Sequence, residues 1–288
     1  MPSEFDDQRT WGPTPSYPIV RSVPHVEREM LVIAGPCSVE SIDQMESVCT
    51  TLSRVGVTYV RGGVYRAGTY PPESFGLQFE KLKMMRVVAD RHGLKVLVEL
   101  LDVRQLEKID PYVDALQVGA RHMQDYALLD RLAKYPKPVT LKRHPGSTMD
   151  EFFGAAEYLL RYGKRDVTLI ERGSVTFQRH VRWGVDVSVI AGVKSLTGIP
   201  IVVDASHGSG RRDFVEPLLL AGMGAGADGF LIEVHPTPAV SLSDAEQAVP
   251  LAYLDTIKLR AQLIHQLVRG QFRTEAEPMY GRLQEGHA

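Results

Sequence analysis

The stretch LVIAGPCSVES, residues 31–41, leads from a short apolar run directly into Gly-Pro-Cys. The run has the length of a buried strand, and polar residues begin where it ends. Longer stretches with helical spacing of apolar residues follow, as at 41–56, 74–93 and 148–163. Seven more strand-like runs alternate with such stretches, at residues 58–64, 95–101, 115–119, 138–143, 167–173, 199–207 and 229–235.

This alternation of strands and helices indicates βα units around a parallel sheet. Eight strands in a chain near the ~250 residues typical of the class predict an α/β fold, the (β/α)8 TIM barrel. A doubly wound open sheet is the alternative. We expect one catalytic domain over residues 31–268, an N-terminal extension over 1–30 with a short strand at 17–23, and a C-terminal tail over 269–288.

Composition excludes several classes of protein. The 288 residues carry a formal net charge of −2 and show no basic stripe, which argues against nucleic-acid or membrane-surface binding. The polar, acidic start lacks the pattern of a secretory signal. The two cysteines provide neither a disulfide framework nor a zinc-knuckle spacing. We therefore predict a cytoplasmic, reduced protein that does not bind nucleic acid or membranes.

Charged residues gather where the predicted strands end, which is where TIM barrels carry their chemistry. Arginine and lysine at one rim favour a small substrate with more than one anionic group, because clustered cations repel one another without an anion. Separate ion pairs around the rim are the alternative. The cations of this set are Arg61, Arg66, Arg121, Lys142, Arg143 and Arg172.

A second group at the same rim combines a thiol, an imidazole and two carboxylates. Such a mixed set suits a borderline divalent metal, namely Mn, Fe, Co or Zn. Spacing alone leaves other interpretations open: Cys37 as a small buried hydrophobe, or His207 acting together with His235. The candidate metal ligands are Cys37, His207, Glu233 and Asp244.

Seven motifs stand in an order that identifies a resemblance: AGPCSVES, RGGVY, GARHMQDY, LKR, ERG, DASHGSGRRD and EVHPTPAVSLSDAEQA. The chain resembles the 3-deoxy-7-phosphoheptulonate (DAHP) synthases, in particular their compact microbial class I subgroup, which is related to 3-deoxy-octulosonate 8-phosphate synthase. The resemblance implies a TIM-barrel transferase. Its reaction is an aldolase-type condensation of phosphoenolpyruvate with erythrose 4-phosphate, in the shikimate pathway to aromatic amino acids.

Carried over residue by residue, the resemblance places the metal on the four ligands named above. Some relatives that work without metal have Asn where Cys37 stands, so Cys37 favours the metal-dependent form. Homo-oligomers are common among the relatives, and we expect one here. The implied phosphoenolpyruvate-binding residues are Arg61, Arg66, Gly119, Ala120, Arg121, Lys142 and Arg172. The candidate catalytic residues are Arg66, Lys142, Glu99 and Asp102.

The chain departs from the family pattern at the acceptor. The family reads Lys-Pro-Arg-Thr-Ser-Pro where residues 66–71 read Arg-Ala-Gly-Thr-Tyr-Pro. In the family that Arg and the adjacent Thr grip the acceptor phosphate, so Gly68 and Thr69 mark an altered acceptor site. Three hypotheses follow: another cation such as Arg143, Arg211 or Arg212 restores the grip; a paralogue of specialised metabolism uses a different aldehyde, either unphosphorylated or with its phosphate placed differently; or the barrel binds anions without catalysis.

Overall fold

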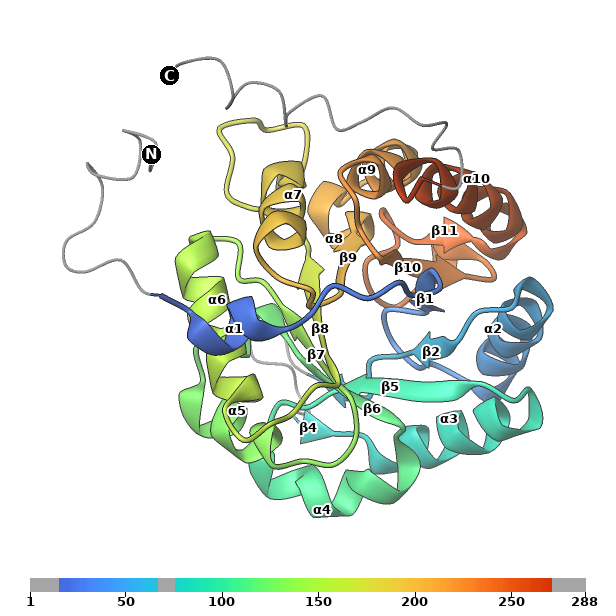
Figure 1. Cartoon of the computed structure of the whole chain (residues 1–288). Coiled ribbons are helices and arrows are strands. Elements are labelled where there is room, and N and C mark those ends of the chain that lie inside the picture. The colour runs from blue at the N-terminus through green and yellow to red at the C-terminus, as the bar shows by residue number, and fades with distance from the viewer. Residues whose placement is uncertain (1–15, 67–75, 271–288) are drawn as a thin grey trace, which may run out of the picture.

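Eight parallel strands form a closed barrel in the computed structural model, which describes residues 16–66 and 76–270 (Figure 1). The strands follow the order β1-β2-β5-β6-β7-β8-β9-β10, and β1 also pairs with β10, which closes the sheet. The predicted (β/α)8 barrel is confirmed, and the open sheet is excluded. The strands are β1 (Leu31–Gly35), β2 (Tyr59–Arg61), β5 (Lys95–Glu99), β6 (Ala115–Val118), β7 (Val139–Lys142), β8 (Val167–Glu171), β9 (Ile201–Asp204) and β10 (Gly229–His235).

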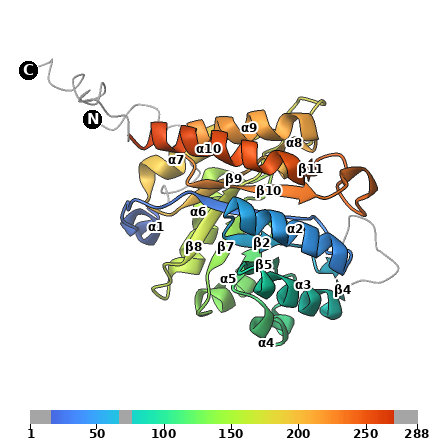
Figure 2. The same ribbon diagram turned by 90° about the vertical axis from the view of Figure 1, so that its right-hand side faces the viewer.

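Helices surround the barrel, as Figures 1 and 2 show. None of those in the described ranges is long and apolar enough to cross a bilayer. Three short strands lie outside the barrel: β3 (Tyr65–Arg66) pairs with β4 (Gly76–Leu77), and β11 (Val249–Pro250) pairs in parallel with the end of β10. The α-helices are α1 (Pro18–Ser22), α2 (Ile42–Val55), α3 (Phe79–Arg91), α4 (Leu106–Ile109), α5 (Tyr126–Ala133), α6 (Met149–Leu160), α7 (Val187–Leu196), α8 (Ala205–Ser209), α9 (Arg212–Gly224) and α10 (Leu254–Val268).

Local sequence signals fix the ends of the helices. The Ser41 side chain accepts a hydrogen bond from the Gln44 backbone N–H at the start of α2, and Gly56, with φ 71°, ends it. At the start of α6, Thr148 and Glu151 form a capping box, in which each side chain accepts a hydrogen bond from the other residue's backbone N–H. These caps set where each chain segment re-enters the barrel.

The barrel interior changes from apolar to charged along its axis. Val202 and Leu231 belong to a buried apolar cluster inside the barrel, together with Ile33, Leu97, Ala115 and Ile170. Two residues further along the same strands stand Asp204 and Glu233, both fully buried. Because side chains alternate along a strand, the next inward position carries the charge. The carboxyl end of the barrel is therefore lined by charged groups that the apolar layer supports from below.

Three details of the sequence prediction are wrong. Residues 17–23 form helix α1 rather than a strand, because Pro18 begins it and Val20 packs inward. The seventh strand ends at Asp204, whose side chain caps α8 by accepting from the His207 backbone N–H. The predicted helix over 74–93 begins only at Phe79, because Gly76–Leu77 pairs with β3.

Gly35, at the end of β1, allows two neighbouring strands to approach closely. A Cβ built on it would lie 2.0 Å from the Arg61 carbonyl oxygen, and its φ is +152°. We expect Gly35→Ala to destabilise the fold by about 1–3 kcal/mol through overpacking, measured as a lower midpoint of denaturant unfolding. In α6, Gly154 has open space around its Cβ position, so Gly154→Ala should leave the midpoint unchanged or raise it. Equal midpoints for both variants would contradict the argument.

Candidate functional site

A thiol and two carboxylates meet at the mouth of the barrel. One ligand atom each from Cys37, Glu233 and Asp244 lies within 4.8 Å of the others. Cys37 follows β1, Glu233 lies on β10, and Asp244 lies in the segment after β10. The Cys37 Sγ donates to Asp244 Oδ2 at 3.1 Å. Asp244 takes a backbone φ of 49°, a left-handed conformation that Asp tolerates better than most residues.

His207 reaches the same group from α8. Its Nε2 lies 3.3 Å from Glu233 Oε1, and its Nδ1 lies 2.8 Å from Asp204 Oδ2. A carboxylate only accepts hydrogen bonds, so Nδ1 carries a proton, and in the neutral ring Nε2 keeps its lone pair toward the cluster. This arrangement is the one that orients histidine ligands in metal proteins.

Two neighbours fix the Glu233 carboxylate. Arg61 Nη1 donates to Oε1 at 2.7 Å, and Gln247 Nε2 donates to Oε2 at 2.5 Å. Both carboxylate oxygens are thus held while Glu233 remains fully buried. Gln247 is a residue that the sequence analysis missed, although it stands three residues after Asp244 in a motif quoted there.

The electrostatics of the cluster fit a cation. Burial raises the pKa of the Cys37 thiol well above its usual value, and the Glu233 charge adds to this, while Arg61 opposes it. Burial would also raise the pKa of Asp204, but His207 and Lys142 outweigh it and hold that pKa well below its usual range. A divalent metal would compensate the negative charge of thiolate and carboxylates, and the soft and hard donors present suit Mn, Fe, Co or Zn.

Three buried cations stand beside the carboxylates. Lys142 Nζ lies 2.7 Å from Asp204 Oδ2, and Arg61 pairs with Glu233. Arg172 is 6% exposed, and within the described ranges its guanidinium has no hydrogen bond or ion pair, only the Trp183 ring at 5.6 Å. Burial lowers its pKa, because a buried guanidinium loses part of its solvation. A buried arginine without a partner would gain one from an incoming anion, which makes Arg172 a candidate anion-binding residue.

The family model of the DAHP synthetase I family matches residues 26–268. The chain belongs to that family. The match runs from before β1 to the last residue of α10, and so it includes every strand of the barrel.

Individual relatives agree with the family assignment. A phospho-2-dehydro-3-deoxyheptonate aldolase of Thermotoga maritima is 40% identical over 218 residues, which are 76% of this chain and 64% of that protein. The chain thus matches less than two thirds of that relative's length. A crystal structure of the Thermotoga maritima DAHP synthase aligns with a TM-score of 0.77 at 38% identity, covering 84% of this chain and 70% of that one. A 2-dehydro-3-deoxyphosphooctonate aldolase of Thioalkalivibrio sulfidiphilus is 26% identical over 270 residues, 85% of this chain and 93% of that protein.

In this DAHP synthetase family member, Gly119 and Glu99 touch across neighbouring strands. A Cβ at Gly119 would lie 1.9 Å from Glu99 Oε1, so any larger residue would require the Glu99 carboxylate to move. The adjoining Ala120 and Arg121 lie in a short 3-10 helix, with Arg121 exposed at the rim. Asp102 instead pairs with Arg104, whose Nε donates to Oδ1 at 2.9 Å and whose Nη2 donates to Oδ2 at 2.8 Å. These hydrogen bonds lower the pKa of Asp102.

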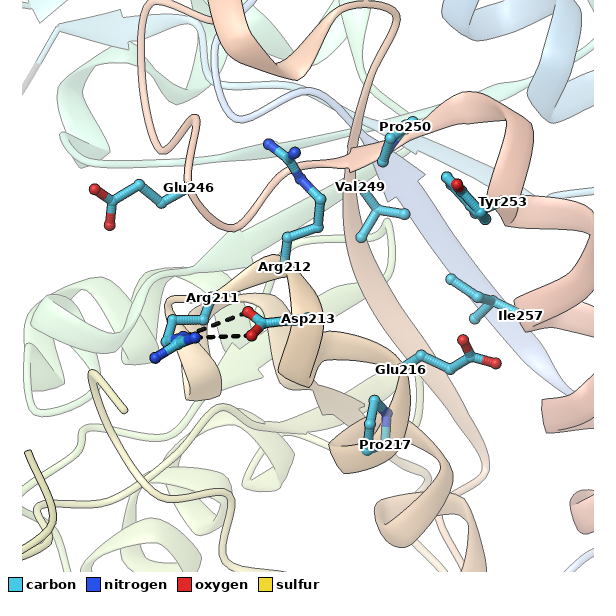
Figure 3. A pocket seen from close by; sticks show the side chains of 10 residues that line it. All are labelled: Arg211, Arg212, Asp213, Glu216, Pro217, Glu246, Val249, Pro250, Tyr253 and Ile257. Carbon is cyan, nitrogen blue, oxygen red and sulfur yellow. Dashed lines mark hydrogen bonds and ion pairs between the residues drawn. The ribbon is translucent and has the colours of Figure 1, made fainter. Parts of the chain in front are cut away.

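The three arginines suggested as alternative binders of the acceptor phosphate all contact other groups of the protein. Arg143 donates to Glu171 Oε2 at 3.0 Å and to the Ser147 carbonyl at 2.7 Å. Arg212 donates to the carbonyls of Ala245 and Ala248, at 2.7 and 2.6 Å, and so anchors the segment that carries Asp244. Arg211 pairs with Asp213, as the dashed lines of Figure 3 show.

The remaining candidates fall outside the cluster or outside the described residues. His235 is buried near Glu40, 3.4 Å away, and accepts from the Thr237 backbone N–H, so the structure brings His207 and not His235 to Glu233. Gly68 and Thr69 lie outside the described residues, as does the side chain of Arg66. Their predicted roles stay predictions.

Proposed function

We propose that this chain condenses phosphoenolpyruvate with erythrose 4-phosphate, giving 3-deoxy-7-phosphoheptulonate and phosphate, with a divalent metal required. The observation that carries the proposal is the placement of three buried cations, Arg61, Lys142 and Arg172, around the cluster of Cys37, His207, Glu233 and Asp244. The family and the names of the relatives support the same reaction. A homo-oligomer and a cytoplasmic location stay predictions.

Phosphoenolpyruvate carries a carboxylate and a phosphate, which match this set of cations. Arg172, unpaired in the described residues, is assigned to one of these anionic groups. Lys142 and Arg61 are already paired with Asp204 and Glu233, so each ion pair is nearly neutral. We assign to these two cations hydrogen bonds that orient the substrate, while their carboxylate partners limit the repulsion between the cations. Arg121 and the Gly119–Ala120 backbone are assigned to the outer side of the phosphate.

The reaction joins C3 of phosphoenolpyruvate to the aldehyde carbon. The aldehyde oxygen takes up a proton, water adds at C2, and the C2–O bond breaks to release phosphate. Cys37, His207, Glu233 and Asp244 would hold the metal, which supplies Lewis-acid polarisation and orientation of the aldehyde when bound. Among the candidate catalytic residues, Lys142 and Glu99 line the mouth, and we assign proton handling to them. Arg66 keeps its predicted role, whereas Asp102 faces Arg104.

A phosphate-release assay tests the proposal. Protein loaded with Mn2+ should release phosphate from phosphoenolpyruvate when erythrose 4-phosphate is added, because the buried cations hold the donor beside the metal cluster. EDTA should abolish the release, and excess Mn2+ should restore it. Release only with a different aldehyde, phosphorylated or not, would favour the paralogue hypothesis. No release with erythrose 4-phosphate or with any other aldehyde tested would favour an anion-binding barrel.

A further inference from the structure

A pocket of about 580 Å3 opens directly beside the cluster of candidate metal ligands. One wall is the segment between β8 and α7, and the other is formed by the end of α8, the turn before α9 and the segment after β10. Asp244 belongs both to the cluster and to the wall of this pocket. The pocket therefore adjoins the cluster at Asp244. We call it the arginine pocket, and its basic lining residues are Arg179, His180, Arg182 and Arg211.

The basic residues of the arginine pocket differ in how they are occupied. Arg182 Nη1 lies 3.6 Å from Asp244 Oδ1, and Arg211 pairs with Asp213. Within residues 16–66 and 76–270, the Arg179 guanidinium has no hydrogen bond or ion pair, and the His180 ring has only an edge contact with Phe214. The carboxylates Asp244 and Glu246 also line the pocket, but neither forms an ion pair with the exposed Arg179, so this guanidinium is available to bind an anion.

The segment that carries Arg179 and His180 is held at its base. The backbone N–H groups of Arg182 and Trp183 donate to carbonyls of α8, at 2.9 and 3.0 Å. At the other end, the buried Glu171 carboxylate accepts from the backbone N–H groups of Gly173 and Asp186, at 2.7 and 3.1 Å. These contacts fix both ends of the segment, which lowers the entropy cost of binding a ligand against it.

The neighbouring groove in Figure 3 has a different character. It shares Arg211 and Glu246 with the arginine pocket, but Val249, Pro250, Tyr253 and Ile257 form its far side. Its other arginine, Arg212, is bound to two backbone carbonyls. Free positive charge is therefore available in the arginine pocket and not in this groove.

We propose that the arginine pocket binds the distal phosphate of the aldehyde acceptor, with Arg179 and His180 as the residues that select a phosphorylated aldehyde. The inference rests on the proposed function, because it assigns the far end of the substrate whose aldehyde group lies at the cluster. It extends that function by assigning acceptor-phosphate binding to Arg179 and His180, which the sequence did not indicate. Arg143 and Arg212, the residues suggested earlier, are held in contacts within the protein.

Arg179→Gln tests this assignment with two acceptors, erythrose 4-phosphate and erythrose. We expect kcat/KM for erythrose 4-phosphate to fall roughly 10- to 100-fold, as for the loss of a charged hydrogen-bonding contact. The KM for phosphoenolpyruvate and the slow turnover of erythrose should stay unchanged. Arg179→Lys should retain part of the selectivity, and Arg179→Gln combined with His180→Gln should lose more. Arg161→Gln is the matched control, since that exposed arginine follows α6 at the opposite end of the barrel.

The outcomes separate the inference from the function on which it rests. An equal fall for both acceptors, or no fall for erythrose 4-phosphate, overturns the inference while the proposed function stands. A wild-type protein that never uses erythrose 4-phosphate overturns the proposed function and the inference with it. Thermal melting of each variant identifies misfolding, and an Arg179→Lys variant that folds but loses all selectivity for the phosphate also counts against the inference.

Discussion

Cys37→Ala is expected to reduce metal-dependent phosphate release by about 1000-fold. Cys37 Sγ lies in one cluster with Glu233 and Asp244, and no other thiol in the described residues lies there. A bound metal is worth several kcal/mol of transition-state stabilisation, and each 1.36 kcal/mol is a factor of ten in rate. The measurement is phosphate release at saturating phosphoenolpyruvate, together with the metal content of the purified protein.

The matched control is Cys49→Ala. Cys49 is buried in α2, away from the cluster, and its burial raises its pKa to about 12, so it is an inert packing residue. This variant should lose some stability but keep its metal content and its turnover. If Cys37→Ala retained both metal and activity, the cluster would have to be assigned to another role.

The fold could be predicted because the strands are buried on both faces. Nearly continuous apolar runs such as 31–35 and 229–235 coincide with β1 and β10, because each strand faces the barrel interior on one side and the helices on the other. The failures lie where a polar side chain redirects the backbone. Asp204 caps α8, and β9 therefore ends three residues before the predicted end. The spacing of apolar residues does not predict such a hydrogen bond from a side chain to the backbone.

The members of the site were predicted more easily than its contacts. Closure of the barrel brings together residues as distant in sequence as Cys37 and Asp244, which any eight-stranded barrel would do for strand ends. The contacts depend on side-chain geometry. Nothing in the sequence distinguishes Arg172, unpaired in the described residues, from Arg143, which binds Glu171. Gln247 was overlooked because an amide carries no charge and has no special spacing.

Asp204→Asn is expected to weaken both the cationic substrate-binding group, through Lys142, and the candidate metal site, through His207. One oxygen of this fully buried carboxylate, Oδ2, accepts from Lys142 Nζ at 2.7 Å and from His207 Nδ1 at 2.8 Å. The asparagine removes the charge that compensates Lys142, and breaking a buried ion pair costs about 3–5 kcal/mol of stability. Loss of the His207 partner should lower metal affinity about 10- to 100-fold. We expect a raised KM for phosphoenolpyruvate and weaker Mn2+ binding in the same variant.

Asp228→Asn provides the matched control, and acid pH provides a second test. Asp228 is a buried aspartate paired with Lys194 at the amino end of the barrel, so its replacement should cost stability without changing Mn2+ affinity. The pKa of Asp204 is held well below its usual range, so its contribution to stability is present above the unfolded value of about 3.9 and is lost as the pH falls through the folded value. The difference in unfolding free energy between wild type and Asp204→Asn should therefore be full at pH 7 and shrink below about pH 4. Two results would contradict this role of Asp204. One is a difference in unfolding free energy that stays constant between pH 7 and pH 3. The other is an Mn2+ affinity of Asp204→Asn equal to that of Asp228→Asn.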